Sequence, residues 1–113
     1  MSGPGAEQTR RGEAAVEAVR GVVLGIPSGT VLSYGDVAEL AQLGSPRLAA
    51  RIMSLGQAGE DVPWWRVVRA DGTSHAPELS IPRWETEGII HKDGRVNMRR
   101  HGLDARDLDG LIG

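Results

Sequence analysis

The stretch SYGDVAELAQLGSPRLAARIMSL, residues 33–55, decides the fold. Ser33 is followed three residues later by Asp36, an arrangement that resembles a helix capping box with aspartate in place of glutamate. This pattern predicts a helix that starts at Tyr34 and continues with an apolar face. The single tyrosine of the chain would then lie in the first turn of that helix.

A second helix is expected directly after the first. Gly44 ends the first helix, Ser45 can cap the next one, and Pro46 fits its first position, where a missing N–H costs nothing. Two helices joined by a tight turn containing glycine are typical of a helix-turn-helix unit. Helical periodicity predicts an inner stripe and an opposite, polar face. The inner stripe is expected to consist of Leu48, Ala49, Ile52, Met53 and Leu55, and the outer face of Arg47, Arg51 and Ser54.

The regions on either side of this unit are less regular. Residues 1–12 combine glycines with mixed charges and are predicted to form a disordered arm. Apolar residues then recur every three to four positions from Glu13 to about Gly25, which predicts a helix. Thr30 to Leu32 reads as an extended link.

Downstream, short elements are expected around turns. We expect a strand over 65–69, a turn at 70–73, a short helix over 82–88 and two short strands over 89–97. Residues 98–113 form a C-terminal tail that is either helical or disordered. The domain is therefore assigned to residues 13–97, mostly α with a small β component.

Length and charge limit the possible functions. The 113 residues fit one domain. Thirteen Lys and Arg against fifteen Asp and Glu give a net charge of −2, so any binding to nucleic acid must come from a local patch. All these cations except Lys92 are arginines, which suit bidentate phosphate contacts. Because no signal peptide or membrane span is found, we expect a cytoplasmic protein, which would be nucleoid-associated if it binds DNA. A monomer is the default expectation.

The chain contains no cysteine. This absence excludes disulfides, thiol chemistry and cysteine-based zinc sites. His75, His91 and His101 show no metal-ligand spacing and are interpreted as solvated loop residues. No metal or cofactor is expected.

Three motifs occur in a specific order: IPSGTVLSYGDVA at residues 26–38, GSPR at 44–47 followed by Arg51, and PWWRVV at 63–68. Together with Gly72-Thr73, they resemble the C-terminal domain of the O6-alkylguanine-DNA alkyltransferases and, more closely, the alkyltransferase-like proteins. The resemblance covers roughly residues 16–97 and implies a winged-helix-like, helix-turn-helix domain.

The loop at residue 64 is the informative part of this resemblance. In the alkyltransferases it reads Pro-Cys-His-Arg-Val, and the cysteine accepts the alkyl group after the histidine has taken its proton. Here Trp64 and Trp65 occupy those two positions. An indole is no nucleophile, so the resemblance implies a protein that is not an enzyme and recognises the lesion without removing it.

The resemblance also assigns roles in DNA binding. Tyr34 would pack at the flipped base or rotate its phosphate, Arg51 would fill the gap in the stack, and Trp64 would line the pocket. Arg47, one turn before Arg51, is the alternative candidate for the side chain that enters the base stack in place of the flipped nucleotide. The other residues expected at the DNA site are Ser33, Ser45, Pro46, Trp65, Arg66 and Val67.

Several of these residues also have structural interpretations. Ser33 is first an N-cap, and the helix start at Ser45 offers amides to a phosphate. In a strand Trp64 and Trp65 would face opposite sides, so one of them, taken to be Trp65, belongs to the core. Arg66 is expected to bond loop carbonyls behind the pocket. Trp84 is expected in the core and is given no role in binding.

The function implied is recognition of O6-alkylguanine in duplex DNA by nucleotide flipping, which flags the lesion for nucleotide excision repair proteins. Two alternatives remain open. A helix-turn-helix transcriptional regulator would read undamaged sequence with Arg47, Arg51 and Ser54, although no dimerisation helix is evident. The other alternative is an enzyme that acts on alkylated bases without a cysteine, but no catalytic constellation lies near Trp64.

Overall fold

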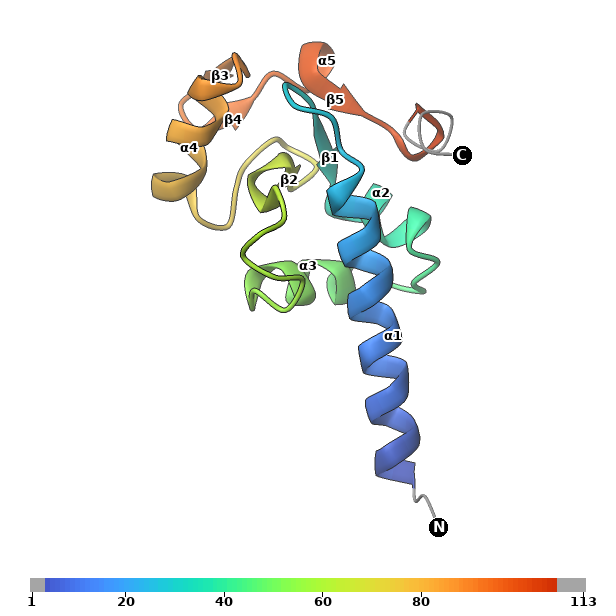
Figure 1. Ribbon diagram of the computed structural model, residues 1–113. Helices are drawn as coiled ribbons and strands as arrows, with labels where there is room; N and C mark the ends of the chain where they lie inside the picture. The colour runs from blue at the N-terminus through green and yellow to red at the C-terminus, as the bar shows by residue number, and fades with distance from the viewer. Residues whose placement is uncertain (1–3, 108–113) are drawn as a thin grey trace.

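The structure, a computed structural model, describes residues 4–107 and is mostly helical with two small sheets (Figure 1). This agrees with the predicted class. Among the described residues, no helix is long and apolar enough to span a membrane. The elements in chain order are α1 (Pro4–Leu24), β1 (Val31–Ser33), α2 (Tyr34–Leu40), α3 (Pro46–Ser54), the 3-10 turn η1 (Trp64–Arg66), β2 (Val67–Val68), α4 (Pro77–Thr86), β3 (His91–Lys92), β4 (Arg95–Val96), α5 (Met98–His101) and β5 (Gly102–Leu103).

Helix α1 begins earlier than predicted. It starts at Pro4 instead of Glu13, so helix replaces most of the disordered arm expected over residues 1–12. Proline suits a first helical turn, and the Ala, Glu, Gln and Arg residues of 6–11 favour helix. In Figure 1 this end of α1 stands away from the body of the molecule. Residues 1–3 of the predicted arm lie outside the described residues.

The helix-turn-helix unit forms as predicted. The Ser33 hydroxyl accepts the N–H of Asp36 at 3.2 Å, and the Ser45 hydroxyl accepts the N–H of Arg47 at 3.2 Å. Pro46 occupies the first turn of α3. These caps fix where both helices start, and hence how α3 is presented on the surface.

The inner stripe of α3 is narrower than predicted. Ala49, Ile52 and Met53 are buried, but Leu48 and Leu55 are 40% and 60% exposed. Leu55 is the C-cap of the helix and therefore no longer follows its periodicity. Leu48 lies at the edge of the stripe, beside a groove toward α1.

The larger sheet has the order β2-β1-β5, and both pairings are parallel. Leu32 of β1 pairs with Val67 on one side and with Leu103 on the other. The residues assigned to a C-terminal tail from Met98 onward therefore contribute a strand to the domain, at least as far as Leu103. The end of that tail, residues 108–113, lies outside the described residues.

His101 fixes this C-terminal segment to the rest of the protein. Its Nε2 accepts the N–H of Ile90 at 2.9 Å, and its Nδ1 lies 2.9 Å from the carbonyl oxygen of Gly29. The side chain is buried, so the interpretation of His101 as a solvated loop residue was wrong. Both ring nitrogens are used to satisfy backbone groups.

The region from residue 64 to residue 97 differs in detail from the prediction. The strand predicted over 65–69 is reduced to Val67–Val68, which follows the 3-10 turn η1 and pairs with β1, not with a hairpin partner. The next helix begins at Pro77, earlier than expected, and includes Pro82. The two strands β3 and β4 pair as predicted.

The core has two parts. One packs α1, α2 and α3 around Val23, Ile26, Leu32 and Ile52. The other surrounds Trp84, which is fully buried as predicted. The Trp84 indole N–H also donates to the carbonyl oxygen of Trp65 at 2.7 Å. The second core part thus anchors the backbone of η1.

Candidate nucleic-acid interface

A pocket of about 490 Å³ opens beside Trp64. Its walls come from the end of α3, from the 56–60 loop, and from α4 with the residues that precede it. Its volume is in the range of ligand pockets in proteins. The residues that line it are Met53, Ser54, Gly56, Ala58, Gly59, Glu60, Trp64, His75, Ala76, Leu79 and Arg83.

Trp64 and Trp65 do not lie on opposite sides of a strand, because η1 is a helical turn. Their rings meet edge to face, with centroids 5.8 Å apart. Trp64 lines the pocket and also packs against the first core part. Trp65 is half-buried at the edge of the second part and is covered by the Arg83 guanidinium, 4.5 Å from the ring centroid. The expectation that Trp65 belongs to the core was therefore only partly met.

Glu87 connects the elements behind the pocket. Its carboxylate accepts hydrogen bonds from the indole N–H of Trp65 at 2.7 Å and from the backbone N–H of Gly29 at 2.9 Å. It also forms an ion pair with the Arg66 guanidinium at 2.8 Å. Arg66 also donates to the carbonyl oxygen of Ile26 at 2.8 Å, which agrees with the predicted contact to a loop carbonyl. No local sequence pattern marks Glu87, which is the C-cap of α4.

The charge of Glu87 is favoured by these contacts. Burial acts to raise the pKa of Glu87, but hydrogen bonds from Arg66, Gly29 and Trp65, together with the charge of Arg66, bring it below its ordinary value. The carboxylate is therefore ionised at neutral pH, and three segments distant in sequence depend on it.

Tyr34, a largely buried residue, contacts His75, which lines the pocket. The Tyr34 hydroxyl lies 2.9 Å from Nδ1 of His75, and the His75 ring lies 5.8 Å from that of Trp64. Burial raises the pKa of Tyr34, against the charge of Arg69, so the phenol keeps its proton. Burial and the charge of Arg69 lower the pKa of His75, so its imidazole is neutral at pH 7.

Sequence reasoning missed His75 by interpreting it as a solvated loop residue. The side chain is only partly exposed and has a defined partner. The partner, Tyr34, lies 41 positions away in the chain, so no local pattern could reveal the contact. The one feature of the sequence that pointed to a role for His75 was its position shortly after Gly72-Thr73, within the part of the chain that resembles the alkyltransferase family.

The outer face of α3 is exposed as predicted. Arg47 and Arg51 are both open to solvent, and neither forms an ion pair with the side chains described, those of residues 12–107. Ser54, one turn after Arg51, lines the pocket. This face of α3 thus leads from two unpaired guanidinium groups to the pocket opening. Such groups can contact phosphates or enter a base stack.

The remaining predicted residues take structural positions. Ser45 caps α3, and Pro46 beside it is exposed. Ser33 caps α2. Val67, expected at the DNA site, is only 1% exposed in β2, so its side chain does not lie on the surface. Its side chain instead packs in the core directly after η1.

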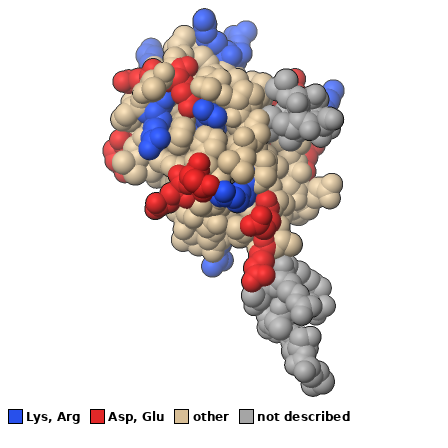
Figure 2. All heavy atoms as spheres, in the orientation of Figure 1, with Lys and Arg blue, Asp and Glu red and all other residues tan. Residues whose placement is uncertain are grey.

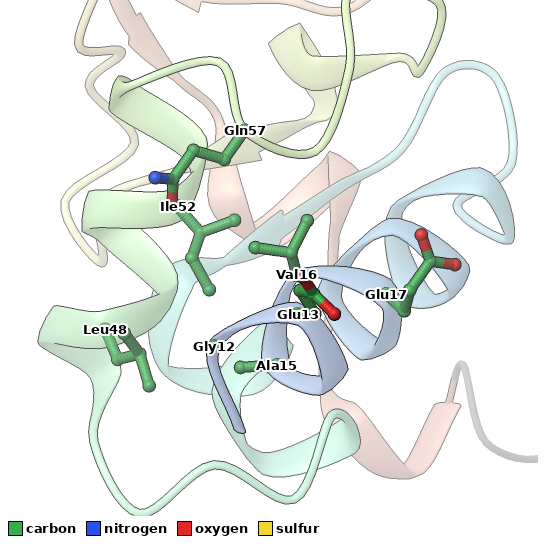
Figure 3. A pocket seen from close by; sticks show the side chains of 8 residues that line it. All are labelled: Gly12, Glu13, Ala15, Val16, Glu17, Leu48, Ile52 and Gln57. Carbon is green, nitrogen blue, oxygen red and sulfur yellow. The ribbon is translucent and has the colours of Figure 1, made fainter. Parts of the chain in front are cut away.

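A second, larger groove of about 670 Å³ lies between α1 and α3 (Figure 3). Figure 3 shows Val16 and Ile52 facing each other across it, with Leu48 further along α3. Glu13 and Glu17 lie at its border. Carboxylates there repel a phosphate backbone, so this groove is not the candidate DNA surface.

On the face shown in Figure 2, the charged side chains do not form a broad basic patch. In the view of Figure 2, Lys and Arg side chains occur in separate groups with acidic side chains between them. Affinity for DNA must then come from a few contacts. Within the part of the chain that the structure describes, no group of His, Asp and Glu could hold a metal ion.

Comparison with known proteins gives three consistent matches. Residues 14–89 match the family of the 6-O-methylguanine DNA methyltransferase, DNA binding domain. A protein of Escherichia coli K12 named "DNA base-flipping protein" is 33% identical over 106 residues, which is 87% of this chain and 81% of the relative. A protein of the same name from Vibrio parahaemolyticus is 31% identical over 88 residues, 71% of this chain and 86% of the relative.

A solved structure supports the fold. It is S. pombe Atl1 in complex with damaged DNA containing O6-carboxymethylguanine, with a TM-score of 0.68 and 24% sequence identity. The match covers 81% of this chain and 95% of Atl1. The fold described above is therefore shared with Atl1.

Proposed function

This chain belongs to the family of the 6-O-methylguanine DNA methyltransferase DNA-binding domain, and we propose that it binds duplex DNA, flips an O6-alkylated guanine into the pocket beside Trp64, and holds it there without repair. The single observation that carries this proposal is a ligand-sized pocket with an indole at the position of the family's reactive cysteine. The names of the two bacterial relatives and the DNA in the Atl1 complex support base flipping and alkylated guanine as the target.

Alkyl transfer by the route of the alkyltransferases has no nucleophile in this chain, because that route needs a cysteine. No cysteine is present, and Trp64 offers a ring face without an ionisable atom. The neighbouring Trp65 uses its N–H as a donor to Glu87, and an indole has no site that could accept a proton from a nucleophile. The lesion is therefore bound and released chemically unchanged.

The helix-turn-helix unit supplies the contacts to DNA. α3 lies in a groove of the duplex, and Arg51 takes the place of the extruded nucleotide in the stack. Arg47 contacts a phosphate. Extruding a base costs a few kcal/mol, less for a pair that alkylation has already weakened, and a planar cation in the gap offsets part of that cost.

Function then depends on residence time. A long-lived complex with extruded base marks the site for another repair pathway, which we infer to be nucleotide excision repair. The pocket is also what separates this proposal from a regulator that reads undamaged sequence, because a helix reading base edges in the major groove needs no cavity beside it.

The experiment compares two duplexes that differ only in one base, guanine or O6-methylguanine. Wild-type protein is titrated into each labelled duplex, and both partners are afterwards analysed by mass spectrometry. We expect tighter binding to the modified duplex and unchanged masses. Equal affinities would reject damage recognition, and loss of the methyl group from DNA would reject the non-catalytic role.

A further inference from the structure

We propose that His75 distinguishes O6-alkylguanine from guanine: its Nε2–H donates a hydrogen bond to the acceptor that O6-alkylation creates at N1 of the purine. This inference rests on the proposed function, because the edge of the purine reaches the pocket only after flipping. It assigns a specificity role to a side chain that the sequence motifs do not mark.

The contact with Tyr34 determines which imidazole nitrogen carries the proton. Tyr34 is 8% exposed, and among the side chains described, those of residues 12–107, the polar partner of its hydroxyl is Nδ1 of His75 at 2.9 Å. A largely buried hydroxyl needs an acceptor, so the phenol donates and Nδ1 accepts. The neutral imidazole carries a single N–H, which must then be at Nε2.

Nε2 is available to a ligand. On the ring it lies away from Nδ1 and hence away from Tyr34. Among the described residues, the one buried side-chain nitrogen or oxygen without a hydrogen bond is Nδ1 of His91. Nε2 of His75 also has no hydrogen-bond partner among the described residues. Because it is not one of their buried unpaired atoms, it is accessible. It belongs to a side chain that lines the pocket next to Trp64.

The chemistry of the lesion fits such a donor. Guanine carries a proton at N1, whereas O6-alkylguanine has a lone pair there and an ether oxygen at position 6. A donor fixed near N1 therefore opposes the N–H of guanine and bonds to the alkylated base. Sites built around a hydrogen bond discriminate far more strongly than apolar walls, which sense only size.

Trp64 cannot supply this discrimination. Stacking on an aromatic ring is tolerant of base identity, because every base has a π face. The indole of Trp64 thus gives affinity for an extruded base, and His75, oriented by Tyr34, gives selectivity. Tyr34 acts in this respect as a positioning residue that keeps the proton of His75 on the pocket side.

The experiment uses three duplexes with a single guanine, O6-methylguanine or 2-aminopurine opposite thymine. 2-Aminopurine has an N1 acceptor but no substituent at position 6, so it separates the contact at N1 from any contact with the alkyl group. Wild-type protein is compared with His75→Phe, which keeps an aromatic ring, and with His75→Gln, which can both accept from Tyr34 and donate to the base. For each duplex the cost of opening the pair is the same in all variants.

We expect His75→Phe to weaken binding of the O6-methylguanine and 2-aminopurine duplexes by about tenfold and to leave the guanine duplex unchanged. His75→Gln should retain most of the preference. A uniform loss on all three duplexes, no loss on any, or equal behaviour of the two variants would overturn the proposal. If wild-type protein itself fails to prefer O6-methylguanine over guanine, the proposed function fails instead.

Discussion

The indole N–H of Trp65 donates to Oε2 of Glu87 at a distance of 2.7 Å. The residue next to Trp64 is therefore bound to an ionised carboxylate but cannot accept a proton. A histidine at position 65 could donate to the same carboxylate from one nitrogen and keep the other as a base. This difference makes the loss of catalysis testable.

Trp64→Cys alone should show negligible methyl transfer from an O6-methylguanine duplex, because no base would activate the thiol. The double variant Trp64→Cys with Trp65→His should react about a hundredfold faster or more, the usual contribution of a positioned base. A methyl-sized mass increase of the protein, followed over time, measures the rate. Equal rates for the two variants would contradict the role given to position 65.

Glu87→Gln should lower the free energy of unfolding at pH 7 by about 2–4 kcal/mol, because it leaves the mostly buried Arg66 guanidinium without its counter-ion. The pKa of Glu87 is lowered in the folded protein, so its stabilisation is present above the ordinary value near 4.5 and is lost as the pH falls below it. Urea unfolding at pH 7 and pH 3 should therefore show a gap between wild type and variant that narrows in acid.

The control for that measurement is Glu85→Gln, two residues earlier, where the side chain is exposed. It should change stability by less than about 0.5 kcal/mol. A constant gap for Glu87→Gln at both pH values would mean that the ionised form of Glu87 is not the stabilising one.

Arg20→Gln should raise the pKa of Asp61. In the folded protein the hydrogen bond from Arg20 is the main cause that holds the pKa of Asp61 at about 2, against an ordinary value of 3.8. The same guanidinium donates to the carbonyl oxygen of Ala58 and so ties α1 to the loop that forms one wall of the pocket. Carboxyl carbon chemical shifts followed by NMR over pH give the value.

Asp71 is an internal reference for this titration. Its pKa is lowered chiefly by a hydrogen bond from the Thr73 side chain, which the substitution does not touch. Asp71 should therefore titrate as in wild type, and an unchanged Asp61 would show that the Arg20 contact does not persist in solution.

Arg51→Ala and Arg47→Ala should have different effects on DNA binding. If Arg51 fills the gap in the stack, its loss removes most of the preference for the lesion. Loss of Arg47, a phosphate contact, should weaken binding to both duplexes alike and reduce the slope of log K against log salt concentration by about 1. Fluorescence anisotropy at several salt concentrations separates the two, and reversed results would exchange their roles.

His101→Ala should lower the free energy of unfolding by about 1–3 kcal/mol, because it leaves the N–H of Ile90 and the carbonyl oxygen of Gly29 without their partner. Thermal unfolding measures the loss. Arg100→Ala, on the exposed side of the same helix, serves as the control and should be nearly neutral. Comparable stability of the two variants would show that α5 contributes little to the fold.

The parts of the fold that could be predicted are those encoded locally. Ser33 and Ser45 fix two helix starts through contacts within three residues of themselves, and both caps form as expected. The turn around Asp93 and Gly94 defines β3 and β4 in the same way; both residues have positive φ. A short-range hydrogen bond leaves its pattern in the sequence.

The parts that could not be predicted depend on distant partners. β5 is too short to show any periodicity and is defined only by its pairing with β1. Glu87 is marked by nothing in its neighbourhood, because its partners Gly29 and Arg66 lie 58 and 21 positions away. The position of Trp64 beside a pocket could be predicted because Trp64 belongs to one of the family motifs. His75 lies outside those motifs, and its contact with Tyr34 leaves no local pattern, so it was missed.

The position of β1 between two later strands has a kinetic consequence. During synthesis, β1 (residues 31–33) has no strand to pair with on one edge until residue 67 has been added. Its other edge stays unpaired until residue 103 has been added. A nascent chain leaving the ribosome thus carries an unsatisfied strand through most of its synthesis. Non-local parallel pairing of this kind slows folding, so a holding chaperone that covers residues 31–33 would act on this protein early during translation.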